Sequence, residues 1–285
     1  MTLRAGMTPR VGITPRAGVI GWPVGHSLSP RIHRFWLKEL GLDGCYEAVV
    51  VPPEWLGDMV DSFRLGRWRG FNVTVPHKEA IMPLLDRIDP AARAIGAVNT
   101  VVAVGDGIFE GRNTDAPGFM ASLKAGAAIH PGRPAVVLGA GGASRAILAI
   151  LNDAGFREIR LLNRDKARAE NLAASFPAIV GDWADRNRLL DGAGLLVNAT
   201  SLGMVGQPPL EIDLAQLPAT AVVTDIVYRP LMTDLLLKAQ ARGNPVVDGL
   251  GMLLYQAVEG FAAWFGTRPA VTPALRANVL AAIGA

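Results

Sequence analysis

The chain has 285 residues, of which 50% are hydrophobic and 19% charged, so it can bury the cores of two domains and is not intrinsically disordered. Its net charge of +3 does not indicate a nucleic-acid partner, because six of the 28 basic residues precede the first acidic residue, Glu39, and the remaining 22 face 25 acidic ones. The single cysteine, Cys45, excludes an internal disulfide and a cysteine-based zinc site and favours a reducing, cytoplasmic location.

Residues 1–18 are predicted to form an irregular leader. They are rich in proline and glycine, contain a six-residue echo (M-T-P-R-V-G, then I-T-P-R-A-G) and lack the apolar segment of a secretory signal. No run of about 18 uncharged apolar residues occurs in the chain, so no membrane span is expected. We assign no function to the leader.

Strands and helices are predicted to alternate after the leader. Short apolar runs predict strands at 19–20, 46–51, 72–75 and 99–104. Apolar residues at helical spacing predict a helix over 30–40, with Ser29 as its N-cap and Pro30 in its first turn.

A second series of elements begins at Pro134. The continuous apolar run 135–138 is typical of a central parallel strand, and a glycine-rich turn follows it. Helices are expected at 143–154, 166–175, 250–265 and 273–283, and strands at 159–162, 194–197 and 221–225. This order predicts two α/β domains with a boundary near residue 115, the second of them built on a parallel sheet.

The turn after the first strand of this series carries the sequence G-A-G-G-A-S at 139–144. It is a variant of the dinucleotide fingerprint, with Ser144 where glycine or alanine is usual. Glycines let the backbone approach a pyrophosphate, whose charge then lies at the helix N-terminus. The pattern predicts a dinucleotide site, and the alternative is a plain tight turn.

The end of the next strand distinguishes between the two dinucleotides. An NAD site usually places an acidic residue there, whereas this chain has Asn163 and Arg164, followed by Lys166 and Arg168. A guanidinium suits a 2′-phosphate, so the pattern favours NADP. Asp165 opposes this interpretation, because its carboxylate could repel the phosphate or bind a ribose hydroxyl. The alternative for Lys166 and Arg168 is that they are ordinary solvated helix residues.

Four polar motifs in the first domain predict a second site; they lie at 21–30, 70–79, 96–100 and 111–115. Ser27 and Ser29 flank a helix entrance and could bind an anion, although an ordinary helix cap explains them equally well. Lys78 follows a strand end, and Asp115 lies at the domain boundary. A lysine and an aspartate that meet in an interdomain cleft would form a charge-paired proton donor, and the alternative is a surface salt bridge of little energetic effect.

Motifs spread from Gly21 to Ala257 resemble the shikimate dehydrogenase family. They read G-W-P-V-G-H-S-L-S-P-R-I-H at 21–33, F-N-V-T-V-P-H-K at 71–78, G-A-V-N-T-V at 96–101, G-R-N-T-D at 111–115, G-A-G-G-A-S at 139–144, N-R at 163–164, N-A-T-S-L-G-M at 198–204, Y-R-P at 228–230 and G-L-G-M-L-L-Y-Q-A at 249–257. The resemblance implies NADPH-dependent reduction of 3-dehydroshikimate to shikimate, a step toward chorismate and the aromatic amino acids. It also implies a substrate domain formed by residues 19–114 and 250–285, because Gln256 on the last helices matches a substrate position, and a Rossmann-type NADP domain over 115–249.

Residue roles follow from the same resemblance. Lys78 matches the catalytic lysine and Asp115 its partner acid, which also binds a substrate hydroxyl. The positions that match substrate contacts are Ser27, Ser29, Asn72, Thr74, Asn99, Asp115, Tyr228 and Gln256. The positions that match cofactor contacts are Gly139, Ala140, Gly141, Gly142, Ala143, Asn163, Arg164, Arg168, Ala199, Thr200, Ser201, Ile226, Gly249 and Met252. The four histidines lack metal-ligand spacing, so no metal is expected.

Two alternatives remain open at this stage. Asp165 is compatible with a relative that also oxidises quinate and uses NAD. A module that only binds the nucleotide or shikimate for sensing would not need Lys78 and Asp115. The sequence does not decide between a monomer and a homodimer.

Overall fold

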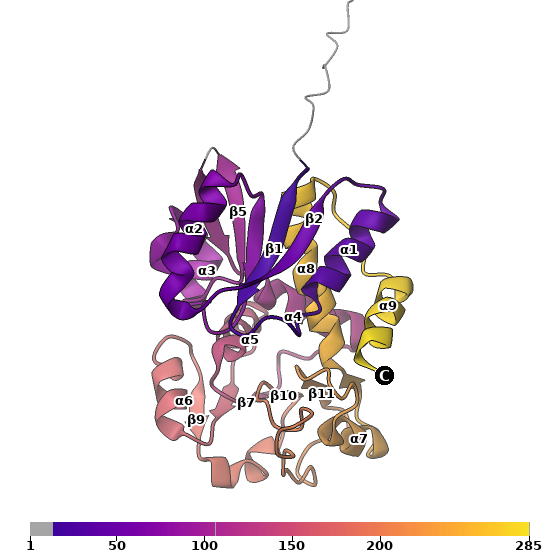
Figure 1. The fold of residues 1–285 in the computed structure, drawn as a ribbon. Helices are drawn as coiled ribbons and strands as arrows, with labels where there is room; N and C mark the ends of the chain where they lie inside the picture. Colours follow the sequence, from indigo (N-terminus) through magenta and orange to yellow (C-terminus); the bar gives the residue numbers. More distant parts are fainter. Residues whose placement is uncertain (1–13, 106, 285) are drawn as a thin grey trace, which may run out of the picture.

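The computed structural model describes residues 14–105 and 107–284, which form two α/β lobes (Figure 1). The predicted leader lies outside the described residues up to residue 13. Its predicted end at residue 18 is wrong, because strand β1 (Arg16–Gly21) begins earlier and pairs with Cys45 from its first residue onward. Pairing to a neighbouring strand therefore extends β1 beyond the short apolar run that predicted it.

The first lobe is built on a mixed sheet of six strands in the order β2-β1-β3-β5-β6-β4. Its elements after β1 are α1 (Ser29–Glu39), β2 (Cys45–Val50), α2 (Leu56–Leu65), β3 (Gly70–Val73), β4 (Arg87–Ile88), α3 (Pro90–Ile95), β5 (Thr100–Gly105) and β6 (Ile108–Arg112). Strand β1 is parallel to both neighbours, β2 and β3. The loops that leave β1 and β3 therefore start at the same edge of the sheet, which is where α/β folds place ligands.

The second lobe contains six parallel strands in the order β12-β11-β10-β7-β8-β9. Its elements are β7 (Ala135–Leu138), α5 (Gly142–Asp153), β8 (Ile159–Leu162), α6 (Lys166–Ala173), β9 (Ile179–Gly181), β10 (Leu195–Asn198), β11 (Val222–Asp225), α7 (Asp234–Ala241) and β12 (Val246–Val247). This is the strand order of a dinucleotide-binding Rossmann fold, and it confirms the predicted doubly wound sheet. The order reverses between β7 and β10, so a ligand is expected at their carboxyl ends.

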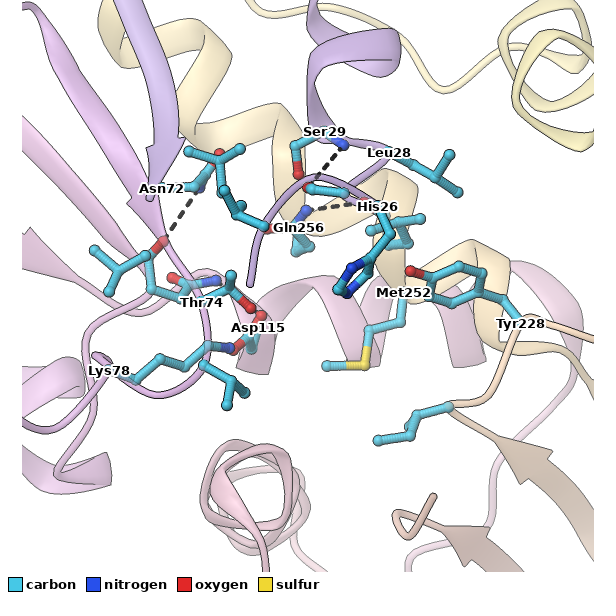
Figure 2. A pocket seen from close by; sticks show the side chains of 18 of the residues that line it. His26, Leu28, Ser29, Asn72, Thr74, Lys78, Asp115, Tyr228, Met252 and Gln256 are labelled. Carbon is cyan, nitrogen blue, oxygen red and sulfur yellow. Dashed lines mark hydrogen bonds and ion pairs between the residues drawn. The ribbon is translucent and has the colours of Figure 1, made fainter. Parts of the chain in front are cut away.

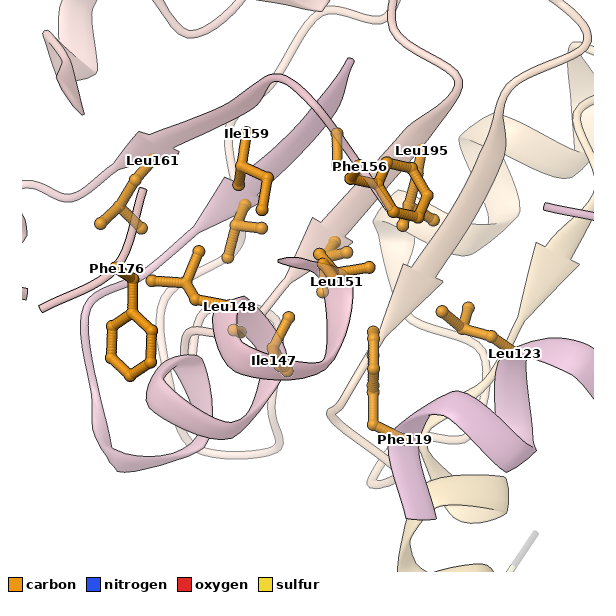
Figure 3. Packing of buried hydrophobic residues seen from close by; sticks show 14 of the residues in the cluster. Phe119, Leu123, Ile147, Leu148, Leu151, Phe156, Ile159, Leu161, Phe176 and Leu195 are labelled. Atoms are coloured by element: carbon orange, nitrogen blue, oxygen red, sulfur yellow. The ribbon is translucent and has the colours of Figure 1, made fainter. Parts of the chain in front are cut away.

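Helices on both faces of the sheet explain why β7 is fully apolar and why the first three residues of β10 are leucine or valine. One core packs Ile147, Leu148 and Leu151 of α5 against strand residues such as Leu161 (Figure 3). Phe119 of helix α4 (Asp115–Gly126) belongs to the same core. Burial of a leucine or phenylalanine side chain contributes about 1.5–3 kcal/mol, so this packing sets the position of α4 on the second lobe.

Helix α8 (Gly249–Phe265) joins the two lobes, and α9 (Pro273–Ile283) follows it (Figure 1). Its first residue, Gly249, lies against the backbone of Ile226 in the second lobe. Near its end, the Trp264 indole donates a hydrogen bond of 2.9 Å to the Val101 carbonyl in the first sheet. The C-terminal helices thus return to the first lobe, as the sequence predicted.

The predicted N-cap of the first helix is wrong. Helix α1 begins at Ser29 itself, and its N-cap position is Leu28, whose side chain forms no capping hydrogen bond. The Ser29 backbone N–H instead points to Ser27 Oγ at 3.3 Å. A serine two residues earlier therefore supplies the oxygen, and the buried Ser29 side chain takes no part in the cap.

Candidate active site

A cavity of about 510 Å³ lies between the lobes, at the edge where the loops after β1 and β3 emerge (Figure 2). Its walls also include the start of α4, the loop after β11 and the first half of α8. The structure brings every predicted catalytic and substrate residue to this cavity, together with three predicted cofactor residues: Ser27, Ser29, Asn72, Thr74, Lys78, Asn99, Asp115, Tyr228, Gln256, Ile226, Gly249 and Met252. Residues more than 200 positions apart in the sequence thus share one site.

Lys78 and Asp115 form an ion pair on the cavity wall (Figure 2). Lys78 Nζ lies 2.5 Å from Asp115 Oδ2, and the two side chains are 21% and 10% exposed. The second carboxylate oxygen, Oδ1, accepts a hydrogen bond of 2.8 Å from Asn99 Nδ2. An ammonium has three N–H groups, so Lys78 keeps two for a ligand while Asp115 fixes its direction.

A buried hydrogen-bond network supports this pair from behind. Asn99 donates to Thr114 Oγ1 as well as to Asp115, and its oxygen accepts from the Thr114 backbone N–H at 2.7 Å. Asn72 donates to Thr100 Oγ1 at 3.0 Å, and Thr100 in turn contacts Asn99. Buried networks of this kind hold each member in one orientation when all donors and acceptors are matched.

Tyr46 extends the network and is a residue that sequence analysis missed. Its hydroxyl donates a 2.5 Å hydrogen bond to Asn72 Oδ1, and its ring stacks on His33 with ring centroids 4.0 Å apart. Both residues are fully buried, which lowers the pKa of His33 to about 3 because burial disfavours its charged form. The only sequence signal for Tyr46 was its place in an apolar strand.

The side of the cavity nearest α1 can bind an anion. Ser29 occupies the first turn of α1, where the unpaired backbone N–H groups of a helix carry partial positive charge. Tyr228 contributes a phenol whose pKa is raised by burial, so it stays neutral and can donate a hydrogen bond. Gln256 lies on α8 and donates to the Leu253 carbonyl at 2.9 Å, which leaves its side-chain oxygen available.

A second cavity, of about 230 Å³, lies at the carboxyl edge of the parallel sheet. It is lined by nine of the predicted cofactor residues: Gly139, Ala140, Gly141, Asn163, Arg164, Arg168, Ala199, Thr200 and Ser201. The other two predicted residues of this loop, Gly142 and Ala143, begin α5 and do not line the cavity. Trp183 also lines it and was missed, because it follows the short strand β9, which the sequence did not predict.

The glycine loop fits a pyrophosphate. Gly139 has φ of +107°, and a Cβ there would lie 2.8 Å from the Ala199 carbonyl oxygen, so the turn admits glycine alone. A Cβ on Gly141 or Gly142 would meet no atom within 4 Å, which shows open space at the start of α5. Ser144, the departure from the usual pattern, is buried and accepts a hydrogen bond from Gly141 N at 3.2 Å. This serine therefore stabilises the loop.

Asp165, the residue that opposed an NADP site, has a structural role. It is the N-cap of α6, where its carboxylate accepts a long hydrogen bond of 3.4 Å from Arg168 N. Lys166 pairs with Asp182 at 2.7 Å, whereas Arg164 and Arg168 form no ion pair with any other described residue. Two guanidinium groups thus remain available at the cavity.

Within residues 14–105 and 107–284, no group of three or more histidine, cysteine, aspartate or glutamate side chains could hold a metal ion. Among the helices that the structure describes, none has the length and apolar character needed to cross a membrane.

Comparisons with known proteins identify the family. Residues 19–101 match the shikimate dehydrogenase substrate binding domain, residues 125–205 match shikimate / quinate 5-dehydrogenase, and residues 249–277 match the shikimate 5'-dehydrogenase C-terminal domain. A shikimate dehydrogenase (NADP(+)) of Paramagnetospirillum magneticum is 58% identical over 266 residues, which cover 92% of this chain and 96% of the relative. The chain belongs to the shikimate dehydrogenase family.

Solved structures of the shikimate dehydrogenase family share this fold. Shikimate 5-dehydrogenase from Thermus thermophilus, in complex with NADP(H) and shikimate, superposes with a TM-score of 0.84 at 41% identity and covers 94% of this chain and 99% of its own. Quinate dehydrogenase from Corynebacterium glutamicum, in complex with NAD, has a TM-score of 0.87 at 30% identity and covers 94% and 99%. The resemblance read from the motifs and the two-domain α/β fold are therefore both confirmed.

Proposed function

We propose that this chain catalyses the reversible, NADPH-dependent reduction of 3-dehydroshikimate to shikimate. The Lys78–Asp115 pair in the interlobe cavity carries the proposal, because it supplies a directed ammonium group in a chain whose second lobe carries a dinucleotide-type loop. The names of the relatives support the same reaction, since the P. magneticum protein is a shikimate dehydrogenase (NADP(+)) and the T. thermophilus structure holds NADP(H) and shikimate. The single Cys45 is consistent with a cytoplasmic location.

In this proposal Lys78 assists at the ketone oxygen. When bound, NADPH supplies the hydride that reduces the ring ketone. The Lys78 ammonium donates a hydrogen bond to the ketone oxygen, stabilises the negative charge that develops there and passes one proton to it. Asp115 keeps Lys78 pointed at this oxygen, and Asn99 holds Asp115 through its other carboxylate oxygen. The ketone thus gains a hydride at carbon and a proton at oxygen.

The polar walls of the cavity would recognise an acid with several hydroxyl groups. Ser27, Ser29 and Tyr228 are proposed to bind the carboxylate, with help from the positive end of α1. Asn72, Thr74, Asn99, Asp115 and Gln256 are proposed to bind the hydroxyl groups. The two N–H groups of Asn72 and one lone pair of its oxygen are already used inside the protein, so a ligand hydroxyl would donate to the remaining lone pair. A substrate without these hydroxyls would leave buried polar groups unpaired.

The second cavity would hold the phosphates and adenosine of NADP. Gly139, Ala140 and Gly141 of this cavity, with Ala199, Thr200 and Ser201, are proposed to contact the pyrophosphate and its ribose, with Asn163 beside them. Gly142 and Ala143, at the start of α5, are proposed to contribute the positive helix N-terminus. Arg164 and Arg168 are proposed to bind the 2′-phosphate. Ile226, Gly249 and Met252 line the substrate cavity and would contact the nicotinamide end. Residues 19–114 with residues 250–285 would then be the substrate domain, to which β1 adds Arg16–Gly18, and residues 115–249 the NADP domain.

Replacement of Lys78 tests the proposal directly. Purified protein should oxidise shikimate with NADP+, and K78A should lose about 100-fold to 10,000-fold in kcat because the developing charge and the proton transfer both lose their partner. The Kd for NADP+, measured by titration calorimetry, should stay within about threefold of wild type. The matched control is K124A, because Lys124 is an exposed lysine near the end of α4. Full turnover by K78A would refute the catalytic assignment, and a wild-type protein that binds both ligands without turnover would support a sensing module.

Quinate oxidation with NAD is the second candidate, favoured by Asp165 and by the fold shared with the C. glutamicum quinate dehydrogenase. The same assay with quinate and NAD+ separates the two functions. A kcat/KM for quinate with NAD+ that equals or exceeds the value for shikimate with NADP+ would favour this second candidate.

A further inference from the structure

We propose that Asp225, which lines neither cavity, is a positioning residue that fixes the loop after β10 and the loop after β11 relative to each other. Asp225 is the last residue of β11 and is 1% exposed. The loop after β10, which begins at Ala199, lines the cofactor cavity, and the loop after β11, which begins at Ile226, lines the substrate cavity. This inference rests on the proposed binding of NADP.

One carboxylate binds both loops. Asp225 Oδ2 accepts hydrogen bonds from Asn198 Nδ2 at 3.0 Å and from Thr233 Oγ1 at 2.8 Å. Asp225 Oδ1 accepts from the Val227 backbone N–H at 2.9 Å. Asn198 ends β10, whereas Val227 and Thr233 belong to the segment that carries Tyr228. The carboxylate thus fixes the two segments relative to each other.

The orientation set by Asp225 passes through Asn198 to the cofactor cavity. Because the Asn198 amide nitrogen faces Asp225, its oxygen faces the other way and accepts from Thr200 N at 3.1 Å and from Thr200 Oγ1 at 2.7 Å. Thr200 lines the cofactor cavity, and its methyl group lies beside Gly139, where a Cβ would be 2.9 Å from it. Asp225 therefore acts on the dinucleotide loop through two side chains.

An amide cannot replace this carboxylate. In D225N, whichever way the new amide turns, its N–H groups face a donor, either Val227 N or Asn198 Nδ2. A flip of Asn198 would relieve the second clash, but it would turn the Asn198 N–H groups toward the Thr200 N–H. Burial raises the pKa of Asp225, and its three donors offset the desolvation of the charge. The mispairing in D225N therefore reaches Thr200, at the cofactor cavity.

The test compares NADP+ affinity among four variants by titration calorimetry, without turnover. D225N and N198D should each raise the Kd for NADP+ at least tenfold. In D225N the new amide places an N–H group against an N–H donor, and in N198D two carboxylates face each other. The exchange D225N/N198D restores a donor–acceptor pair between the two positions. A carboxylate at position 198 opposes the Leu202 carbonyl, to which Asn198 Nδ2 donates at 3.1 Å, in both N198D and the exchange, so the exchange should bind NADP+ at least threefold more tightly than N198D. The control D234N removes a carboxylate at an exposed position of α7 and should leave the Kd unchanged.

Steady-state kinetics add a second readout. The KM for shikimate in D225N should change less than the Kd for NADP+, because most substrate contacts lie on the first lobe. NADP+ affinity within twofold of wild type in D225N, or no recovery in the exchange variant, would overturn the inference. If D225N does not fold, T233V and its control T233S replace it, and equal Kd values in that pair would overturn the inference. Wild-type protein that binds no NADP+ would instead refute the proposed function.

Discussion

Gly118 lies where helices α4 and α8 contact each other, at a point with no room for a side chain. These two helices carry Asp115 and Gln256, which both line the active-site cavity. A Cβ on Gly118 would lie 2.7 Å from the Cα, N and Cβ atoms of Gln256. Backbone atoms inside a helix cannot move aside as a flexible side chain can, so G118A should push the two helices apart.

The magnitude follows from two opposing contributions. Overpacking of a close contact costs about 1–3 kcal/mol, whereas a Gly to Ala change in a helix gains up to about 1 kcal/mol from propensity. The matched control is G57A in α2, where a Cβ would meet no atom within 4 Å and only the propensity gain applies. The free energy of unfolding of G118A should therefore lie about 1–3 kcal/mol below that of G57A.

Urea denaturation of both variants and wild type measures this difference. G118A should also raise the KM for shikimate several-fold, because Gln256 moves with α8, while G57A should leave it unchanged. If G118A is as stable as G57A and its KM equals that of wild type, the reasoning about this helix contact is refuted.

Three further outcomes are expected. R168A should raise the Kd for NADP+ about tenfold and leave that for NAD+ unchanged, because only NADP carries the 2′-phosphate; equal losses in calorimetric titrations would contradict this. D165T should keep the N-cap of α6 while removing a negative charge, and should increase the preference for NADP+ over NAD+ several-fold; an unchanged ratio would show that Asp165 does not influence the choice. Burial holds the pKa of His33 at about 3, against 6.5 when unfolded. Below pH 6.5 the unfolded chain therefore binds a proton that the folded chain does not, and stability should fall by up to about 1.4 kcal/mol per pH unit toward pH 3. Replacement by phenylalanine, H33F, should remove this part of the slope in urea unfolding at pH 7 and pH 5, and an identical slope would contradict the assignment.

Periodicity predicted the elements with a strong local signal. The bounds of β7 and of β8 were predicted as observed, because β7 is a continuous apolar run and β8 has three apolar residues around the single charged residue Arg160. Strands β9 and β12 were not predicted, since three and two residues carry too little pattern to be seen. The Ser29 cap was predicted wrongly because its local sequence fits a cap, while the observed start of α1 depends on Ser27.

The motifs and the glycine turn predicted, from sequence alone, the family, the two-domain α/β fold and many of the residues that line the two cavities. They could do so because dinucleotide loops and polar strand ends are short segments whose chemistry is written in neighbouring residues. Only the tertiary structure decided how these residues are oriented. Tyr46 and Asn72 are 26 residues apart, Asn198 and Asp225 are 27 apart, and Gly118 lies against Gln256 from a distant helix. Hydrogen bonds and close contacts between such distant residues leave no periodic trace in a single sequence, because each depends on how two separately formed elements pack.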